Sequence, residues 1–296
     1  MNNVYAEVKQ VEQNLKKHVI HLAKDIGERN YVQYKNLETA ADYIFAEFKK
    51  YGYEPYNQFY TIEKGDLVKR KRYRNVIAEK KGNSEIIVIG AHYDSVLGSP
   101  GADDNASAVA GLLEIARLLK NINTKRTIQF VAFTNEEPPF FYTENMGSRV
   151  FAREARKNNE KIVAMITLEM IGYYTDKKQK YPLFLGLFYP DKGNYIGIVS
   201  DIFSYRIAIK IKRYFKQHSA FPVQMLIAPR TFSAINLSDN SSFWIYGYKA
   251  VMITDTAYFR NPNYHSEYDL PETLNYKSMA EVVDGLSKAV LELVNE

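Results

Sequence analysis

The sequence predicts an α/β fold: a single domain, residues 1–296, with a mostly parallel mixed central sheet and helices on both of its faces. Strand-like and helix-like segments alternate along the chain, which favours a parallel sheet with crossover helices. Several of the strand-like segments are almost wholly apolar, as are strands that are covered on both faces. No internal repeat, low-complexity tract or linker interrupts the pattern, so one domain is expected.

The composition is that of an ordinary globular protein, and it narrows the chemistry. The chain has no cysteine, which excludes disulfides, a thiolate nucleophile and cysteine ligands to zinc. The net charge of +5 is mild for this length, and no apolar run approaches the ~18 to 20 residues of a membrane helix. Neither nucleic acid nor a membrane is therefore expected as a partner. The N-terminus lacks the apolar core of a signal peptide, so a cytoplasmic location is expected, although a secreted chain written without its signal would look the same.

The N-terminal part begins with two helices and continues with two strands. An apolar stripe predicts a helix over residues 5–26, and a second stripe at helical spacing predicts one over 37–51, with Gly52 as its stop. Short runs of strand-forming residues follow at 58–62 and 75–79, and the first of them is a candidate edge strand.

The rest of the chain alternates between apolar runs and amphipathic segments. The apolar runs predict buried strands at 85–91, 127–133, 162–168 and 250–254, and a short strand at 195–200. The periodic segments predict helices at 105–119, 146–157, 203–217 and 276–294.

The chemistry starts in residues 90–111, between an apolar strand and a helix. This segment holds His92, Asp94 and the acidic pair Asp103-Asp104. Imidazole nitrogen and carboxylate oxygen are the usual ligands of a catalytic zinc, and a ligating histidine commonly has a carboxylate behind its other ring nitrogen. His92 is therefore a candidate ligand with Asp94 behind it, and the acidic pair is a candidate source of another ligand. The alternative is that the acidic pair only caps the helix.

Polar residues also follow the other apolar strands. In chain order these residues are Glu136, Glu137, Glu169, Asp255, Tyr264 and His265. Ligands of open α/β sheets bind outside the carboxyl ends of the strands, so we expect these side chains to surround one crevice. A buried pair of glutamates is unfavourable unless cations lie beside it, and two neighbouring metals with one unligated carboxylate as a base would account for the set. Taken singly, each acid could instead be a helix cap or a surface charge, and each histidine a structural residue.

In this order the motifs resemble those of the co-catalytic di-zinc aminopeptidases, the family of bacterial leucyl aminopeptidases and aminopeptidase Y. The matching segments are 26–29 (Ile-Gly-Glu-Arg), 75–80 (Asn-Val-Ile-Ala-Glu-Lys), 92–94 (His-Tyr-Asp), 101–104 (Gly-Ala-Asp-Asp), 135–137 (Asn-Glu-Glu), 168–172 (Leu-Glu-Met-Ile-Gly), 238–239 (Ser-Asp), 255–257 (Asp-Thr-Ala) and 260–265 (Arg-Asn-Pro-Asn-Tyr-His). They span nearly the whole chain, and the ordered set is specific although each piece alone is not. The resemblance implies a zinc-exopeptidase-like fold, two Zn²⁺ ions per chain and peptides as substrates.

The resemblance also implies a role for each matching residue. The five implied metal ligands are His92 and Glu169 for one zinc, Glu137 and His265 for the other, and Asp103 bridging both. Asp104 would help to hold Asp103. Glu136 corresponds to the general base, and Asp94 to the residue that orients the histidine of the first site. Tyr264 lies where some relatives keep a tyrosine that hydrogen-bonds the tetrahedral intermediate.

Some residues depart from the usual family pattern. The chain has Glu169 where the best-known members have aspartate, and Asn240 where many have a histidine. Residues 137–147 are longer than the usual loop after the glutamate pair. These differences leave the ligand set complete and bear on the substrate pocket. Five aromatic residues could line an apolar side-chain pocket near the metals or could equally be rim packing: Phe140, Phe141, Tyr142, Tyr258 and Phe259.

We expect a metal-dependent exopeptidase, an aminopeptidase that removes N-terminal residues, preferably apolar ones, from peptides. A serine hydrolase is disfavoured because the chain lacks a Gly-x-Ser-x-Gly motif, and a His-Glu-x-x-His metalloprotease because that motif is absent. The alternatives are a glutaminyl-peptide cyclotransferase, which in its branch works with one zinc, and a carboxypeptidase-type zinc exopeptidase. A non-catalytic binding protein on the same fold is a further alternative, but such relatives typically lack metal ligands.

Overall fold

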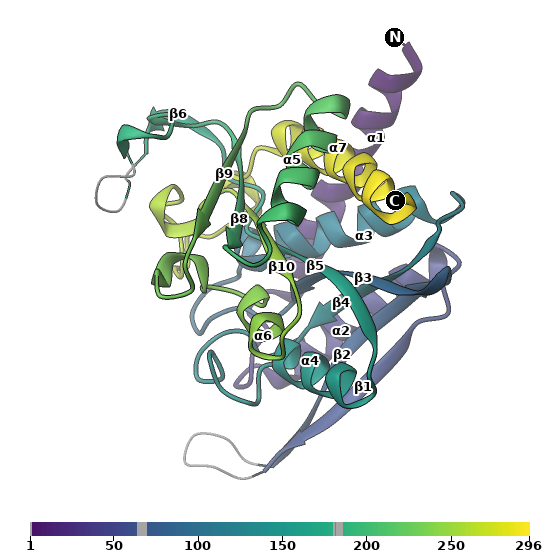
Figure 1. Ribbon diagram of the computed structural model, residues 1–296. Helices are drawn as coiled ribbons and strands as arrows, with labels where there is room; N and C mark the ends of the chain where they lie inside the picture. Colours follow the sequence, from purple (N-terminus) through teal and green to yellow (C-terminus); the bar gives the residue numbers. More distant parts are fainter. Residues whose placement is uncertain (1, 64–69, 180, 182–185) are drawn as a thin grey trace.

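An eight-stranded mixed sheet forms the centre of the protein (Figure 1). The computed structural model describes residues 2–63, 70–179, 181 and 186–296. In spatial order the strands are β1 (Tyr56–Ile62), β2 (Lys71–Lys80), β4 (Arg126–Phe133), β3 (Asn83–His92), β5 (Lys161–Glu169), β10 (Ala250–Thr254), β8 (Ile196–Asp201) and β9 (Val223–Ala228). The four central strands from β4 to β10 run parallel, β9 runs parallel to β8, and the other pairs are antiparallel.

Helices cover both faces of this sheet. One face carries α1 (Asn2–Ile20), which continues as a π-helical turn (His21–Ile26), together with α2 (Tyr34–Lys50), α3 (Ala108–Leu119), α5 (Tyr205–His218) and α7 (Tyr276–Asn295). The other face carries the shorter α4 (Gly147–Lys157) and α6 (Asn240–Ile245), which lie side by side in Figure 1. Each face has its own apolar core, because alternate residues of the buried strands point to opposite faces. The α/β class, the mostly parallel mixed sheet and the two helical layers predicted from the sequence are confirmed.

Some elements were not predicted. The edge strand β9, the helix α6 and a small two-stranded sheet, β6 (Thr175–Lys178) with β7 (Lys192–Gly193), lack the patterns on which the prediction relied. The helix α6 has six residues, too few for a periodic pattern, and β9 is only half-buried along most of its length. The strands β9, β6 and β7 lie at the edge of the main sheet or outside it, where burial imposes little pattern on the sequence, whereas α6 is buried but too short to show one.

The helix predicted to begin at Asn105 begins later, at Ala108. A π-helical turn, Ala102–Ser107, precedes it, and Asp104 and Asn105 have non-helical backbone angles within that turn. The side chain of Asn105 explains the delay, because it donates to the carbonyl of Leu168 and accepts from the amide of Met170 at the end of β5. Side chains that bond to backbone in this way compete with helix formation.

Within the described residues, no helix combines the length and the apolar character that a membrane crossing requires.

Candidate metal centre

The carboxyl ends of the central strands bring together side chains that are far apart in sequence. His92 is the last residue of β3 and Glu169 the last of β5. Glu137 follows β4, Asp104 lies in the turn after β3, and His265 lies in the loop after β10. These strands are neighbours and parallel, so their ends meet at one edge of the sheet, as the sequence predicted.

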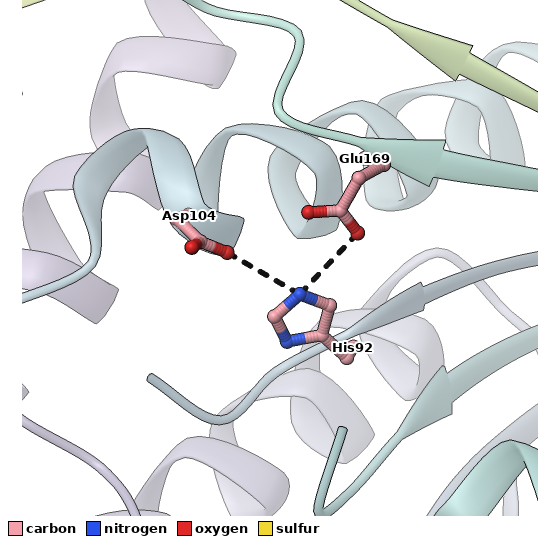
Figure 2. Close-up of side chains that lie close together, drawn as sticks. All are labelled: His92, Asp104 and Glu169. Carbon is pink, nitrogen blue, oxygen red and sulfur yellow. Dashed lines mark ion pairs between the residues drawn. The ribbon is translucent and has the colours of Figure 1, made fainter. Parts of the chain in front are cut away.

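A first cluster joins one histidine to two carboxylates (Figure 2). The Nε2 atom of His92 lies 3.4 Å from Asp104 Oδ1 and 3.4 Å from Glu169 Oε2. All three side chains are buried, and their ligand atoms are close enough to one another to hold a single metal ion. One nitrogen and two carboxylate oxygens form a donor set that suits zinc.

A second cluster shares Asp104 with the first. The Nε2 atom of His265 lies 3.2 Å from Asp104 Oδ2 and 3.3 Å from Glu137 Oε2. These three residues also have ligand atoms within reach of one metal ion. The two oxygens of Asp104 therefore face two different histidines, which is the arrangement expected of a carboxylate between two metal ions.

The adjacent Asp103 lies outside both clusters, and this differs from the bridging role that the resemblance assigned to it. Its Oδ1 accepts from the amide of Gly172 at 2.9 Å, and its Oδ2 accepts from the side chain of Asn261 at 2.8 Å. Burial, and next the charge of Asp255, raise the pKa of Asp103 well above its usual value. The ligand groups therefore favour Asp104 over Asp103 as the candidate for the carboxylate between two metal ions, and the hydrogen bonds of Asp103 anchor the turn.

The clusters contain polar atoms that the protein itself does not satisfy. His92 Nε2, Asp104 Oδ1 and Glu137 Oε1 are buried and have no hydrogen-bond partner among the described residues. An unpartnered buried polar group is unfavourable by about 1–3 kcal/mol and calls for an explanation. Since all three atoms are metal-ligand types that converge on the same two clusters, bound cations provide that explanation. The residues present fit two divalent metal ions.

The pKa values of the clustered side chains also indicate that buried carboxylates are crowded together here. Burial raises the pKa of Glu137 to about 8 and the pKa of Glu136 well above its usual value. Burial alone would lower the pKa of His265, but the adjacent Asp104 and Glu137 carboxylates outweigh it and raise the pKa to about 10. Without a cation these groups would retain protons, and a bound metal would replace those protons.

Asp94 lies behind His92 and also holds the glutamate pair. Its Oδ1 is 3.4 Å from Nδ1 of His92, which leaves Nε2 of that ring facing the first cluster. The same carboxylate accepts from the amides of Glu136 and Glu137 at 3.1 and 3.0 Å. The structure therefore places Asp94 where the sequence predicted and adds a second contact that the sequence did not indicate.

Asp269 makes the equivalent contact on the other side of the site. It accepts from the amides of Asp103 and Asp104 at 2.9 and 3.0 Å. Because Asp269 follows His265 by four residues, it joins the two segments that carry the second cluster. Nothing in the local sequence identified it, since an isolated aspartate in a loop resembles any turn residue.

Two further residues that the sequence analysis left without a role support the site. Ser238 donates to Glu169 Oε2 at 2.6 Å and so orients that carboxylate. The fully buried Arg29 donates to the carbonyls of Tyr93 at 2.7 Å and of Gly101 at 2.8 Å, which ties the loop after β3 together. Both residues lie in segments that carried the family resemblance, 238–239 and 26–29. Membership in those motifs was therefore the only sequence feature that could have pointed to a role for them.

The predicted base and the predicted tyrosine lie beside the clusters. Glu136 Oε2 is 3.9 Å from His92 Nε2, and Glu136 belongs to neither three-residue group. The ring of Tyr264 stacks on the ring of His265, with 3.7 Å between centroids and 15° between planes. Both residues line a cavity of about 260 Å³ that adjoins the two clusters.

The aromatic residues proposed for the pocket divide into two groups. Phe141, Tyr258 and Phe259 line the cavity. Phe140 is buried and packs against the rings of Tyr31 and Tyr73 instead. The ring of Tyr142 contacts that of Phe141 at a tilt of 35°, and its hydroxyl donates to the carbonyl of Asn236.

Comparison with known proteins gives a consistent family assignment. The sequence model described as Peptidase family M28 matches residues 75–290. The uncharacterized protein YfbL of Escherichia coli is 37% identical over 286 residues, covering 93% of this chain and 86% of YfbL. Leucine aminopeptidase 1 of Metarhizium robertsii is 28% identical over 219 residues, and the match covers 70% of this chain but only 51% of that protein.

Solved structures share the fold at low sequence identity. The zinc aminopeptidase BSAP from Bacillus subtilis superposes with a TM-score of 0.75 and 16% identity, covering 96% of this chain and 95% of that one. A glutaminyl cyclase from Bacteroides thetaiotaomicron, bound to N-acetylhistamine, superposes with a TM-score of 0.71 and 18% identity, covering 96% and 97%. These likenesses concern the fold, which carries more than one chemistry.

Proposed function

Because the chain belongs to peptidase family M28, we propose that it is a zinc-dependent aminopeptidase that removes N-terminal residues from peptides. The observation that carries the proposal is the position of Asp104, whose two oxygens face His92 and His265 in two separate clusters. Two complete ligand sets favour two Zn²⁺ ions per chain. The one-zinc cyclotransferase that the resemblance offered as an alternative would leave the second set without a role, so the second set argues for hydrolysis.

The lining of the cavity favours an aminopeptidase over a carboxypeptidase. A carboxypeptidase must bind the terminal carboxylate of its substrate, which calls for a cationic side chain. Among the described residues that line the cavity, none is a lysine or an arginine. The described lining therefore offers no partner for a terminal carboxylate, which favours a substrate bound by its amino end.

The mechanism follows from the positions of the clusters and of Glu136. Zinc ions held by the two clusters would lower the pKa of an attacking water and polarise the scissile carbonyl. Glu136, whose pKa is raised chiefly by burial, would take the proton of that water and deliver it to the leaving amine. Asp94 fixes the backbone of Glu136 and thereby its distance from the reacting atoms.

The position of Tyr264 would allow its hydroxyl to assist the hydrolysis. Burial, and next the charge of Asp104, raise the pKa of its hydroxyl, so the hydroxyl stays protonated and can donate a hydrogen bond. Its ring is held by stacking on His265, which places the side chain at the wall of the cavity beside the second cluster. We propose that it donates to the oxyanion that forms during hydrolysis.

The test combines metal content with turnover of aminoacyl-4-nitroanilides before and after chelation. The expected result is close to two zinc ions per chain and release of nitroaniline that stops on chelation. Glu136→Gln should lower turnover by about 10²- to 10⁴-fold, because it removes general acid–base catalysis, and should leave zinc content unchanged. Glu144→Gln, at an exposed glutamate, serves as the matched control. Turnover that survives both chelation and Glu136→Gln would refute the proposal.

A further inference from the structure

The cavity beside the metal centre has a floor made of two rows of residues that cross the sheet. The pairing of strands aligns the first row, which runs from β5 to β9: Glu169, Thr254, Gly197 and Gln224. The second row is one layer deeper and runs from β10 to β9: Met252, Val199 and Leu226. All of these residues line the cavity. The floor therefore begins at a candidate metal ligand and ends on the edge strand of the sheet.

The cavity is longer and larger than a leucine side chain needs. Neighbouring strands are ~4.8 Å apart, so the three steps from β5 to β9 span about 14 Å. The volume is about 260 Å³. A protein cavity of about 150 Å³ accommodates benzene, and a leucine side chain has fewer carbon atoms than benzene. The cavity therefore has room for an aromatic ring as well as for leucine.

Three tyrosine rings form one part of the cavity lining, the tyrosine wall. Tyr181, Tyr189 and Tyr195 all line the cavity, and their hydroxyls bond within the protein. The hydroxyls of Tyr181 and Tyr195 are 3.0 Å apart, and the hydroxyl of Tyr189 donates to the carbonyl of Met225 at 2.9 Å. The guanidinium of Arg260 lies 4.6 Å from the centre of the Tyr195 ring, on which it stacks as a cation–π contact. With their hydroxyls engaged, the tyrosines offer mainly ring surface to a ligand.

We propose that this cavity binds an aromatic side chain at the N-terminus of the substrate, so that peptides beginning with phenylalanine, tyrosine or tryptophan are preferred over those beginning with leucine. The inference rests on the proposed aminopeptidase function. An aromatic ring gains contacts with the tyrosine wall beyond its burial. Charged side chains are disfavoured, because the described lining carries charge only at the metal end.

The first test measures kcat/KM for the phenylalanine and leucine nitroanilides. The phenylalanine substrate should be preferred by about tenfold, the scale expected of a buried ring with aromatic contacts. Leu226→Phe places a protein ring at the far end of the floor, and should reduce the preference to near unity. Ile227→Phe is the matched control: it is the next residue of β9, its side chain points to the other face, and it does not line the cavity. The control should keep the preference.

The aromatic wall is tested at Tyr189. Tyr189→Leu removes a ring and should lower the phenylalanine-to-leucine ratio several-fold, whereas Tyr189→Phe retains the ring and should shift the ratio less. Binding is measured separately by calorimetry, with phenylalaninamide and leucinamide added to the zinc-loaded Glu136→Gln protein. Tighter binding of phenylalaninamide is expected.

The outcomes separate this inference from the proposed function. If no nitroanilide is hydrolysed and neither amide binds, the aminopeptidase proposal fails and this inference fails with it. If leucine and phenylalanine substrates are hydrolysed equally well, or if Leu226→Phe retains the wild-type ratio, the aminopeptidase proposal stands and the assignment of the cavity to an aromatic side chain is refuted.

Discussion

The contacts of His18 allow a prediction of how stability depends on pH. His18 is buried where α1 packs against α2 and α3, with Nδ1 2.6 Å from the hydroxyl of Tyr43 and Nε2 3.0 Å from that of Tyr51. The nearest carboxylate oxygen, on Glu114, is 3.9 Å away. Burial lowers the pKa of His18 to about 4 and outweighs the attraction of Glu47, so the imidazole is neutral in the folded protein at neutral pH.

The sign and size of the effect follow from linkage. The pKa is about 4 in the folded state and 6.5 in the unfolded state, so between these values the unfolded chain binds more protons. The stabilisation from neutral His18 is present above pH 6.5 and is lost as the pH falls towards 4. At pH 5 the loss amounts to about 2 kcal/mol, at about 1.36 kcal/mol per pH unit below 6.5. The full loss is about 3 kcal/mol, a large share of a typical folding free energy of 5–15 kcal/mol.

The assay is urea denaturation of the wild type and of His18→Gln at pH 8 and pH 5. Other titrating groups contribute to both proteins, so the difference between them isolates His18. The wild type should lose about 2 kcal/mol more than the variant on going to pH 5. Tyr51→Phe, which keeps the buried imidazole, is the control and should retain the wild-type pH dependence. A difference between wild type and His18→Gln that is the same at both pH values would refute the argument.

Two further predictions concern metal binding. Asp104→Asn should weaken zinc binding in both clusters, whereas Asp103→Asn should leave two zinc ions bound. Competition with a chromophoric chelator measures both affinities. The reverse result would show that Asp103, and not Asp104, is the bridging ligand. Ser238→Ala removes the hydroxyl that donates to Glu169, so it should lower the zinc affinity of the cluster that contains His92 by about tenfold and leave the affinity of the cluster that contains His265 unchanged. Equal losses of affinity in both clusters would contradict this prediction.

The sequence predicted the part of the fold that burial determines. The apolar runs that became β3, β4 and β5 are covered on both faces, so their composition marked them clearly. The edge strand β9 is half-exposed and α6 is very short, and neither was predicted. The tyrosine wall was not predicted, because it brings together Tyr181, Tyr189 and Tyr195, whose relative positions no local pattern defines.

The candidate site was predicted at the level of segments but not of every side chain. Converging strand ends brought His92 and Glu169 together, as expected from a parallel sheet. The choice between Asp103 and Asp104 depended on the direction of adjacent side chains in an irregular turn, which sequence alone does not specify. Asp269 was missed because its role arises from a long-range contact with that turn. The two-zinc stoichiometry and the cytoplasmic location stay predictions.

The row of residues from Glu169 to Gln224 connects the candidate metal centre to the part of the cavity that we propose binds the substrate side chain. Its first member lies on a central strand, where a substitution disturbs the packing of both faces, and its last member lies on a half-exposed edge strand with one neighbour. Substitutions at the outer end can therefore change which side chain is accepted while the centre of the sheet keeps its structure. This geometry makes β9 the place to begin changing the selectivity that we propose for the cavity.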